Sequence, residues 1–238
     1  ILLSTVEQLV MVSRSEAEEL TSLFAIKKEY VSVIQNIVEC YDAGSETQEP
    51  DGINKILKEY RVPFKICMIG RNDPVKNYPL AFETIRLFLD ETKEKALFVL
   101  VGISHDDAAL RRLREEYLEN IIVLEQSNGA STILSYCNAL LITSKKEGCP
   151  LVVLESFCCG KPVVGTNVPG IYDLVTDGIN GLLCPQNARE LSKALHRLIE
   201  DGNLYQTLSD NARAYGSAMN TRDWAMEYFR LYKTLLNK

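Results

Sequence analysis

Six short apolar runs recur along the chain, and each is too short to be a typical helix. They read FKICMIG (64–70), ALFVLVG (96–102), NIIVLE (120–125), ALLITS (139–144), KPVVGT (161–166) and NGLLCP (180–185). Because apolar residues follow one another without alternation, both faces of each strand are expected to be buried, as in parallel sheets. Segments with helical spacing separate the runs, for example 78–92 and 188–201. The pattern predicts an α/β fold with a doubly wound, Rossmann-like parallel sheet that binds ligands at the carboxyl ends of its strands.

The chain of 238 residues is expected to hold one main domain with extensions. Residues 1–45 read as strand, helix and strand, the remainder of a preceding acceptor domain and its hinge. A polar stretch at 42–52 marks the linker into the main domain, residues 46–202. Residues 203–238 form two amphipathic helices, and the apolar face around Trp224 is expected to pack on another part of the protein.

Net charge and cysteine usage exclude several classes of protein. A net charge of −6 argues against a broad nucleic-acid surface. No apolar run is long enough to span a bilayer, no signal peptide is recognisable, and the start reads as cut from a longer polypeptide. The seven cysteines are scattered and contain no C-x-x-C pair, which predicts no zinc site. We expect these cysteines to be reduced small hydrophobes and the protein to be cytoplasmic.

The stretch KKEGCPLVVLESFCCGKPVVG (145–165) places a glutamate on each side of a helix start. Pro150 suits the first turn of a helix, and Gly160 suits the position that follows its last residue. Open backbone N–H groups in residues 149–152 would bind an anion. Glu147 and Glu155 would then face sugar hydroxyls, since carboxylates bind ribose in many nucleotide sites. From spacing alone, two surface glutamates without a ligand remain the simpler interpretation.

A longer stretch of sequence favours the ligand site over two surface glutamates, because it resembles a known family. EGCPLVVLESFCCGKPVVGTNVPGIYDLVTDGINGLL resembles the E-x7-E segment of retaining nucleotide-sugar glycosyltransferases of the GT-B type (glycosyl transferases group 1). Cys149 and Ser156 depart mildly from the family, which has an aromatic or small residue and an alanine at these positions. The resemblance implies the C-terminal half of a GT-B fold, with extra C-terminal helices that pack back toward the N-terminal domain. The matching residues are Ser144, Glu147, Gly148, Pro150, Glu155, Gly160, Pro162, Val163, Val164, Gly170, Asp173, Val175, Asp177, Gly178 and Gly181.

A second segment, MIGRNDPVKNYPLAFETI, resembles the family's Gly-Arg-x(4–5)-Lys loop. The resemblance implies that Arg71 and Lys76 stabilise the diphosphate leaving group and that Glu147 touches the transferred sugar. Without the resemblance, both cations would read as solvated surface residues. Residues 124–127 lie in the segment implied to hold the base, without a single candidate. The implied donor-binding residues are Gly70, Gly102, Gly148, Cys149, Pro150, Leu151, Val152 and Glu155.

The resemblance implies transfer of a sugar from a UDP- or GDP-sugar, with UDP favoured, to a glycan or lipid-linked acceptor with retained anomeric configuration. No metal or other cofactor is expected. The implied N-terminal acceptor domain is missing from this chain. Any peripheral contact with the inner face of the membrane would be made by that domain. Neither His105 nor His196 matches the family's catalytic histidine. His105 reads as a surface residue in a loop from which it could approach the nucleotide, and His196 reads as structural. Two alternatives stay open: a non-catalytic module that binds nucleotide-sugars, and a sugar-nucleotide 2-epimerase of the same fold.

Overall fold

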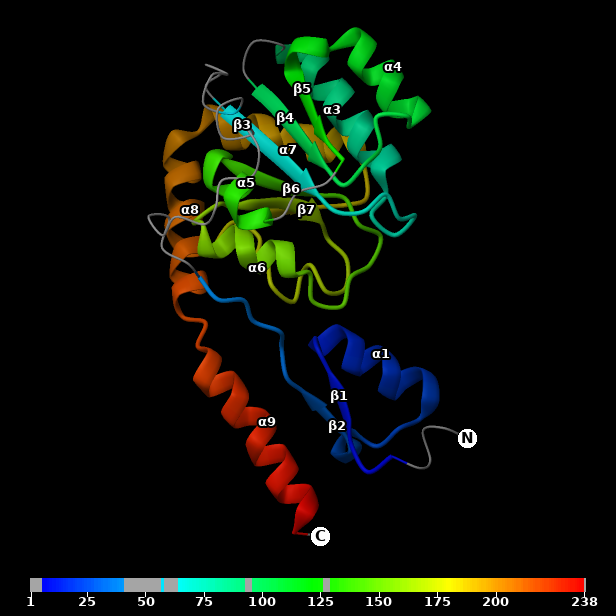
Figure 1. The fold of residues 1–238 in the computed structure, drawn as a ribbon, viewed down its shortest axis with the longest axis vertical. Helices are drawn as coiled ribbons and strands as arrows, with labels where there is room; N and C mark the ends of the chain where they lie inside the picture. Colours follow the sequence, from blue (N-terminus) through cyan, green and yellow to red (C-terminus); the bar gives the residue numbers. More distant parts are fainter. Residues whose placement is uncertain (1–5, 41–56, 58–63, 93–95, 126–128, 238) are drawn as a thin grey trace.

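The computed structural model describes residues 6–40, 57, 64–92, 96–125 and 129–237. Six parallel strands form one sheet in the order β5-β4-β3-β6-β7-β8 (Figure 1). The predicted α/β class and doubly wound sheet are therefore confirmed, while the predicted linker at 42–52 lies outside the described residues. The strands are β3 (Phe64–Ile69), β4 (Ala96–Val101), β5 (Ile121–Leu124), β6 (Ala139–Ile142), β7 (Val163–Thr166) and β8 (Gly181–Cys184).

Strand β3 lies at the centre of this sheet and pairs with β4 on one side and β6 on the other. The chain first builds outward from β3 through β4 to β5, and then returns to build β6, β7 and β8 on the opposite side. The order of the strands thus reverses between β3 and β6. In open α/β sheets the crevice at such a reversal is where ligands bind.

Helices cover both faces of the sheet, as the apolar runs predict (Figure 1). One core joins α3, α4 and α7 to the sheet face that carries Ile66 and Leu100. The other joins α5 and α6 to the face that carries Cys67 and Val99. These helices are α3 (Tyr78–Thr92), α4 (Ala108–Glu116), α5 (Ala130–Tyr136), α6 (Leu151–Cys158) and α7 (Ala188–Glu200).

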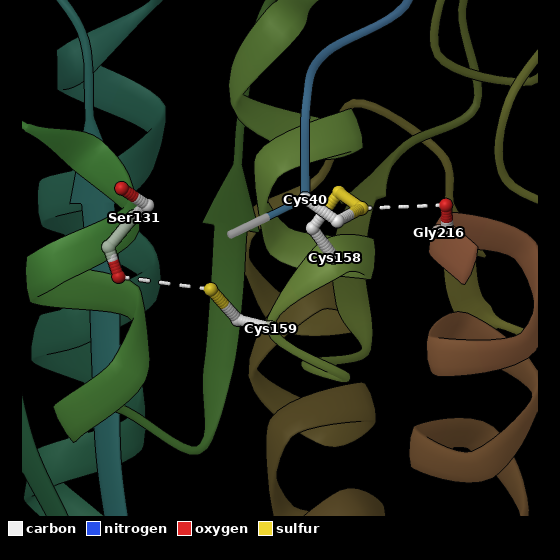
Figure 2. The surroundings of a disulfide bond; sticks show 5 residues. All are labelled: Cys40, Ser131, Cys158, Cys159 and Gly216. Atoms are coloured by element: carbon white, nitrogen blue, oxygen red, sulfur yellow. Dashed lines mark hydrogen bonds between the residues drawn. A yellow bond between two sulfur atoms is a disulfide. The ribbon is translucent and has the colours of Figure 1, made fainter. Parts of the chain in front are cut away.

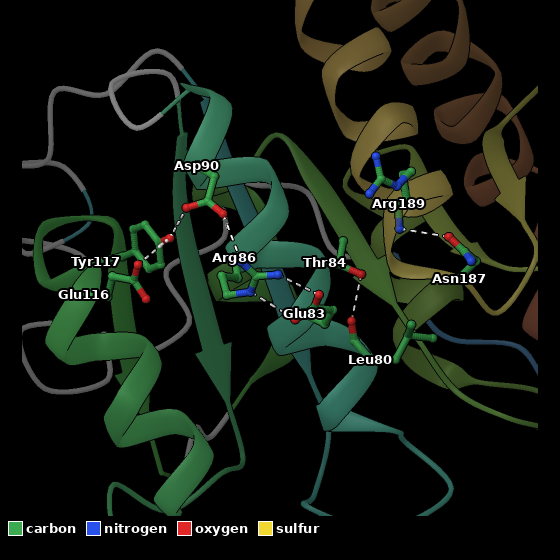
Figure 3. A network of polar contacts seen from close by, with 9 residues as sticks. All are labelled: Leu80, Glu83, Thr84, Arg86, Asp90, Glu116, Tyr117, Asn187 and Arg189. Atoms are coloured by element: carbon green, nitrogen blue, oxygen red, sulfur yellow. Dashed lines mark hydrogen bonds and ion pairs between the residues drawn. The ribbon is translucent and has the colours of Figure 1, made fainter.

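Polar contacts tie the outer side of α3 to the end of α4 (Figure 3). Arg86 donates to Glu83 at 2.8 and 3.0 Å and to Asp90 at 3.0 Å. The hydroxyl of Tyr117 donates to Asp90 as well. The two ion pairs of Arg86 are exposed, and their partners lie three and four residues away on the same helix. Each pair therefore stabilises the fold by only about 0.2–0.5 kcal/mol.

A smaller unit precedes the sheet and two helices follow it. Strands β1 (Leu9–Met11) and β2 (Val31–Val33) pair in parallel around α1 (Arg14–Phe24). Helix α8 (Gly202–Ser217) packs on α6, and α9 (Thr221–Leu236) extends beyond it on the same side as β1, α1 and β2 (Figure 1). We call residues 9–33 the front unit. No described helix is both long and apolar enough to cross a membrane.

The apolar face of α9 is largely exposed beyond Trp224 in the part of the chain that the structure describes. None of its residues is buried, and the side chains of Phe229 and Tyr232 are 57% and 59% exposed. Trp224 packs on Tyr228 of the same helix. That this face packs on another part of the protein therefore stays a prediction.

The sequence GIYDLV (170–175) predicts a short helix, and this prediction is wrong, because the segment forms successive turns. Gly170 adopts a φ of +80°, which a helix does not allow. The carboxylate of Asp173 also accepts a hydrogen bond from the Gly170 N–H at 2.9 Å. A side chain that bonds its own nearby backbone in this way competes with helix formation.

The expectation that every cysteine is reduced is also wrong. A disulfide joins Cys40, at the end of the segment that follows β2, to Cys158 at the end of α6 (Figure 2). Cys40 Sγ also lies 3.3 Å from the carbonyl oxygen of Gly216, to which only a reduced thiol could donate. The remaining cysteines are free and mostly buried, as expected of small hydrophobes: Cys67, Cys137, Cys149, Cys159 and Cys184.

Candidate functional site

The loops that follow β3 and β6 meet where the strand order reverses. The backbone N–H of Lys145 donates to the carbonyl of Val75 at 2.8 Å. The hydroxyl of Thr143, which is fully buried, donates to the carbonyl of Lys76 at 2.9 Å. Two loops far apart in the sequence are therefore fixed against each other by hydrogen bonds at the carboxyl edge of the sheet.

Lys76 and Glu147 form an ion pair across these loops. Lys76 Nζ lies 2.6 Å from Glu147 Oε1, and the two side chains are 26% and 12% exposed. The hydroxyl of Ser144 donates to the same carboxylate oxygen at 2.6 Å. The structure thus brings together two of the predicted catalytic residues. It adds Ser144, which the sequence comparison matched to the family without assigning it a role.

The other predicted cation is placed differently. Arg71 is exposed, and its guanidinium forms no hydrogen bond or ion pair with the residues that the structure describes. Its backbone N lies 3.3 Å from the position that a Cβ on Gly102 would occupy. Its main chain is therefore held at the site edge while its side chain remains available to a ligand.

Gly102 allows the ends of β3 and β4 to pack closely. Gly102 has a φ of +90°, and a Cβ there would lie 2.4 Å from the carbonyl oxygen of Gly70. The hydroxyl of Tyr78 donates to that same carbonyl at 2.5 Å. Both predicted glycines thus border the site, and Gly102 is required there by backbone packing.

Helix α6 begins beside Glu147 with an open amino end. Pro150 is the N-cap rather than the first helical residue, and it forms no side-chain cap. The first amides of the helix, at Leu151 and Val152, therefore have no partner within the helix. Burial raises the pKa of the thiol of Cys149, the residue just before this helix start.

The far end of α6 follows the predicted pattern. Gly160 has a φ of +65° and follows the C-cap residue Cys159. Its N–H donates to the carbonyl of Phe157, and the N–H of Lys161 donates to the carbonyl of Ser156, each at 2.8 Å. This is the Schellman arrangement that glycine favours at a helix end.

Glu155 lies half-buried on α6 without a hydrogen-bonding partner among the described residues. Burial raises the pKa of its carboxyl group above the ordinary value. A desolvated carboxylate without a partner is costly, and such groups are enriched at functional sites. The arrangement suits a carboxylate that receives hydrogen bonds from a ligand.

A cavity of about 310 Å³ lies near the start of α6 but is not lined by the predicted cations. Leu151 is the one predicted donor-binding residue in its wall. The other lining residues come from the segment after β2 and from the start of α9: Asn36, Ile37, Glu39, Thr221 and Trp224.

His196 occupies a packed position and His105 a surface position, as predicted. His196 stacks on Phe88 with ring centroids 4.4 Å apart. His105 lies in an exposed loop, where its backbone N–H donates to Glu125 at 2.8 Å and its ring contacts Arg114. No cluster of potential metal ligands occurs among the described residues. Residues 126 and 127, two of the base-contact candidates, lie outside that part of the chain.

The sequence matches a family of known proteins. The sequence profile of the glycosyl transferases group 1 matches residues 51–215. The chain is 27% identical over 236 residues to the N,N'-diacetylbacillosaminyl-diphospho-undecaprenol alpha-1,3-N-acetylgalactosaminyltransferase of Campylobacter jejuni, covering 96% of this chain and 61% of that enzyme. It is 28% identical over 193 residues to the UDP-Gal:alpha-D-GlcNAc-diphosphoundecaprenol alpha-1,3-galactosyltransferase of Escherichia coli, covering 77% of this chain and 48% of that enzyme.

A solved structure shares the fold. The Anabaena protein HepE, determined in complex with UDP and glucose, superposes with a TM-score of 0.77 at 22% identity. The match covers 98% of this chain and 64% of HepE. The chain therefore spans roughly half to two thirds of the length of these proteins, and its sheet and helices are the C-terminal half of a GT-B fold. Since the family profile covers well over half of its residues, the chain belongs to the glycosyl transferases group 1.

Proposed function

We propose that this chain is the donor-binding half of a retaining glycosyltransferase that transfers a sugar from a UDP-sugar to a glycan or lipid-linked acceptor. The observation that carries the proposal is the meeting of Lys76 and Glu147, 2.6 Å apart, beside the open amino end of α6. The names of the Campylobacter and Escherichia relatives support a lipid-linked acceptor, and the latter name supports a UDP-sugar.

The proposed chemistry follows from these charges. When the bond between the sugar C1 and the phosphate oxygen breaks, the electron pair stays on the diphosphate. Lys76, the exposed Arg71 side chain and the first amides of α6 would stabilise that charge. Glu147 would accept a hydrogen bond from the transferred sugar, and Glu155 would accept hydrogen bonds from the ribose.

Retention is proposed to arise from attack on the same face that the diphosphate leaves. The acceptor oxygen forms the new bond to C1, and its proton moves to the departing phosphate oxygen. This route requires no protein nucleophile, so Glu147 serves as a contact for the sugar. Determining the anomeric configuration of the product by NMR, with the full-length parent enzyme, tests this step.

Nucleotide titration by calorimetry tests the site in the chain itself. Lys76→Ala should weaken UDP binding at least about tenfold, because a charge-assisted contact to phosphate is lost. Glu155→Ala should weaken it comparably and should also abolish a preference for UDP over 2′-deoxy-UDP. The exposed residues Lys193→Ala and Glu119→Ala are matched controls. Unchanged UDP affinity in both site variants would refute the assignment.

Two alternatives give other outcomes. A non-catalytic module would bind UDP-sugar, but the full-length parent would transfer no sugar to any acceptor. A 2-epimerase would interconvert free UDP-sugars without an acceptor, which NMR of the nucleotide-sugar detects. Within the described residues, His105 is exposed and held by Arg114, and His196 is stacked on Phe88, so neither histidine favours the epimerase.

The acceptor domain is proposed to lie in a part of the protein that this chain does not contain. The front unit and the uncovered face of α9 support this proposal. Phe229 and Tyr232 on α9, and Leu23 and Phe24 on α1, are each more than half exposed. Any peripheral contact with a membrane would also be made by that domain.

A further inference from the structure

The first turn of α1 contacts the turn that follows β7. Ser13 is the N-cap of α1, and its side chain accepts a hydrogen bond from the Glu16 N–H. Ser15, two residues further on, is only 7% exposed. Its backbone N–H lies 3.1 Å from Asp173 Oδ1, and its hydroxyl donates to Asp173 Oδ2. Two residues 158 positions apart thus share both a main-chain and a side-chain hydrogen bond.

Asp173 extends this contact to Gly170. The Gly170 N–H donates to Asp173 Oδ2 at 2.9 Å and to Ser15 Oγ at 3.1 Å. The carboxylate therefore accepts from two N–H groups and one hydroxyl, and one of those N–H groups is at the amino end of α1. Negative charge is favoured at that end by the open amides and the helix dipole.

Gly170 in turn fixes the backbone of Glu147. A Cβ on Gly170 would lie 2.2 Å from the carbonyl oxygen of Glu147, so only glycine allows this contact. On its other side, the N–H of Glu147 donates to the carbonyl of Pro169 at 3.0 Å. Both peptide groups of Glu147 are thus held by the turn that Asp173 and Ser15 fasten.

The front unit also touches the residues on either side of Glu147. A Cβ on Gly148 would lie 3.2 Å from the Val12 side chain and 3.8 Å from the carboxylate of Glu16. Lys146 forms an ion pair with Glu19 of α1. The amino end of α1 therefore lies directly against the loop that presents Glu147 to the site.

We propose that Ser15 and Asp173 are positioning residues, which set the carboxylate of Glu147 according to how the front unit is seated. This inference rests on the proposed function of Glu147 as the contact for the transferred sugar. Neither Ser15 nor Asp173 contacts Lys76 or Glu155. The pair should therefore affect recognition of the sugar and leave recognition of the nucleotide largely unchanged.

Calorimetry with UDP and with UDP-sugars tests the inference in the chain. The probes are UDP-glucose, UDP-galactose and UDP-N-acetylglucosamine, and the one that the wild-type chain prefers over UDP is used. Asp173→Asn and Ser15→Ala should keep the Kd for UDP within about twofold and weaken UDP-sugar binding at least about fivefold. Asp223→Asn and Ser22→Ala, on exposed faces of α9 and α1, are the controls. An equal loss for both ligands, or no loss for either, would reduce the contact to a structural role and overturn the proposal.

Hydrogen exchange gives a readout without ligand, which separates this inference from the proposed function. Peptides that contain Glu147 and Gly170 should exchange at least about tenfold faster in both variants than in the wild type or the controls. If no nucleotide binds the wild type, the proposed function fails. The hydrogen-exchange rates still test whether Ser15 and Asp173 hold the Glu147 loop. Unchanged exchange would refute the inference even if UDP binds. Should Asp173→Asn not fold, as judged by circular dichroism, Ser15→Ala alone decides the outcome.

Discussion

Replacing Lys76 by methionine is expected to lower the free energy of unfolding by about 2 kcal/mol. A hydrogen bond between charged groups contributes about 1.5–3 kcal/mol when it is shielded from water. The Lys76–Glu147 bond is 2.6 Å long and its side chains are 26% and 12% exposed, so it lies within this range and not with surface pairs. Ser144 still donates to Glu147 in the variant, which keeps the loss below the roughly 3–5 kcal/mol of an abandoned buried charge.

A double-mutant cycle isolates the pair from the packing of the lysine stem. Urea unfolding of the wild type, Lys76→Met, Glu147→Gln and the double variant should give a coupling energy of about 2 kcal/mol. The exposed pair of Lys193 and Glu190, with side chains 65% and 44% exposed, is the control. Its cycle should give about 0.2–0.5 kcal/mol, and added salt should lower that value further.

A coupling energy below about 0.5 kcal/mol for Lys76 and Glu147, equal to that of the control pair, would refute this reasoning. It would mean that the two loops present solvated charges instead of a shielded pair. A ligand phosphate would then meet no preorganised cation, and the proposed stabilisation of the leaving group would lose its physical basis.

Two further predictions concern the disulfide and the half-buried carboxylate. Cys158→Ser, or reduction of the wild type, should lower the free energy of unfolding by about 4 kcal/mol, because the Cys40–Cys158 bond links residues 118 positions apart. Urea unfolding measures this loss. The control Cys159→Ser breaks no disulfide and should lower the free energy of unfolding clearly less. Burial raises the pKa of Glu155 in the folded chain, so its proton stabilises the fold below the unfolded pKa of about 4.3, and this contribution is lost as pH rises through the higher folded value. Thermal unfolding between pH 4 and 8 should therefore show Glu155→Gln gaining on the wild type as pH rises, and a difference independent of pH would contradict this.

The strands of the sheet could be predicted from the sequence because burial on both faces leaves a continuous apolar run. All six residues of β4 are buried, for example, and its predicted range 96–102 differs from the observed end by one residue. Gly160 likewise marked the end of α6, since a left-handed residue is needed there. Such features depend on local physics that a single segment displays.

The order of the strands could not be predicted in this way, and the site depends on it. Lys76 meets Glu147 because β3 and β6 are neighbours, which follows from packing of the whole sheet. Spacing within either loop carries no trace of that contact, and only the resemblance to a family implied it. The disulfide between Cys40 and Cys158 escaped prediction for the same reason, since its partners are distant in sequence.

The state of each carboxylate around α6 distinguishes its role in physical terms. The carboxylate of Asp173 already accepts hydrogen bonds from donors within the protein, so a ligand would not stabilise it further. Glu155 is desolvated and has no described partner, so the fold bears its cost without a compensating contact. Glu147 is intermediate between these two cases. It has a partner in Lys76, but a phosphate that approached Lys76 would share or break that bond. Under the proposed function, the free energy lost when Lys76 and Glu147 separate would be recovered only if a sugar hydroxyl then bonds Glu147, and the site would thereby favour a nucleotide-sugar over a bare nucleotide.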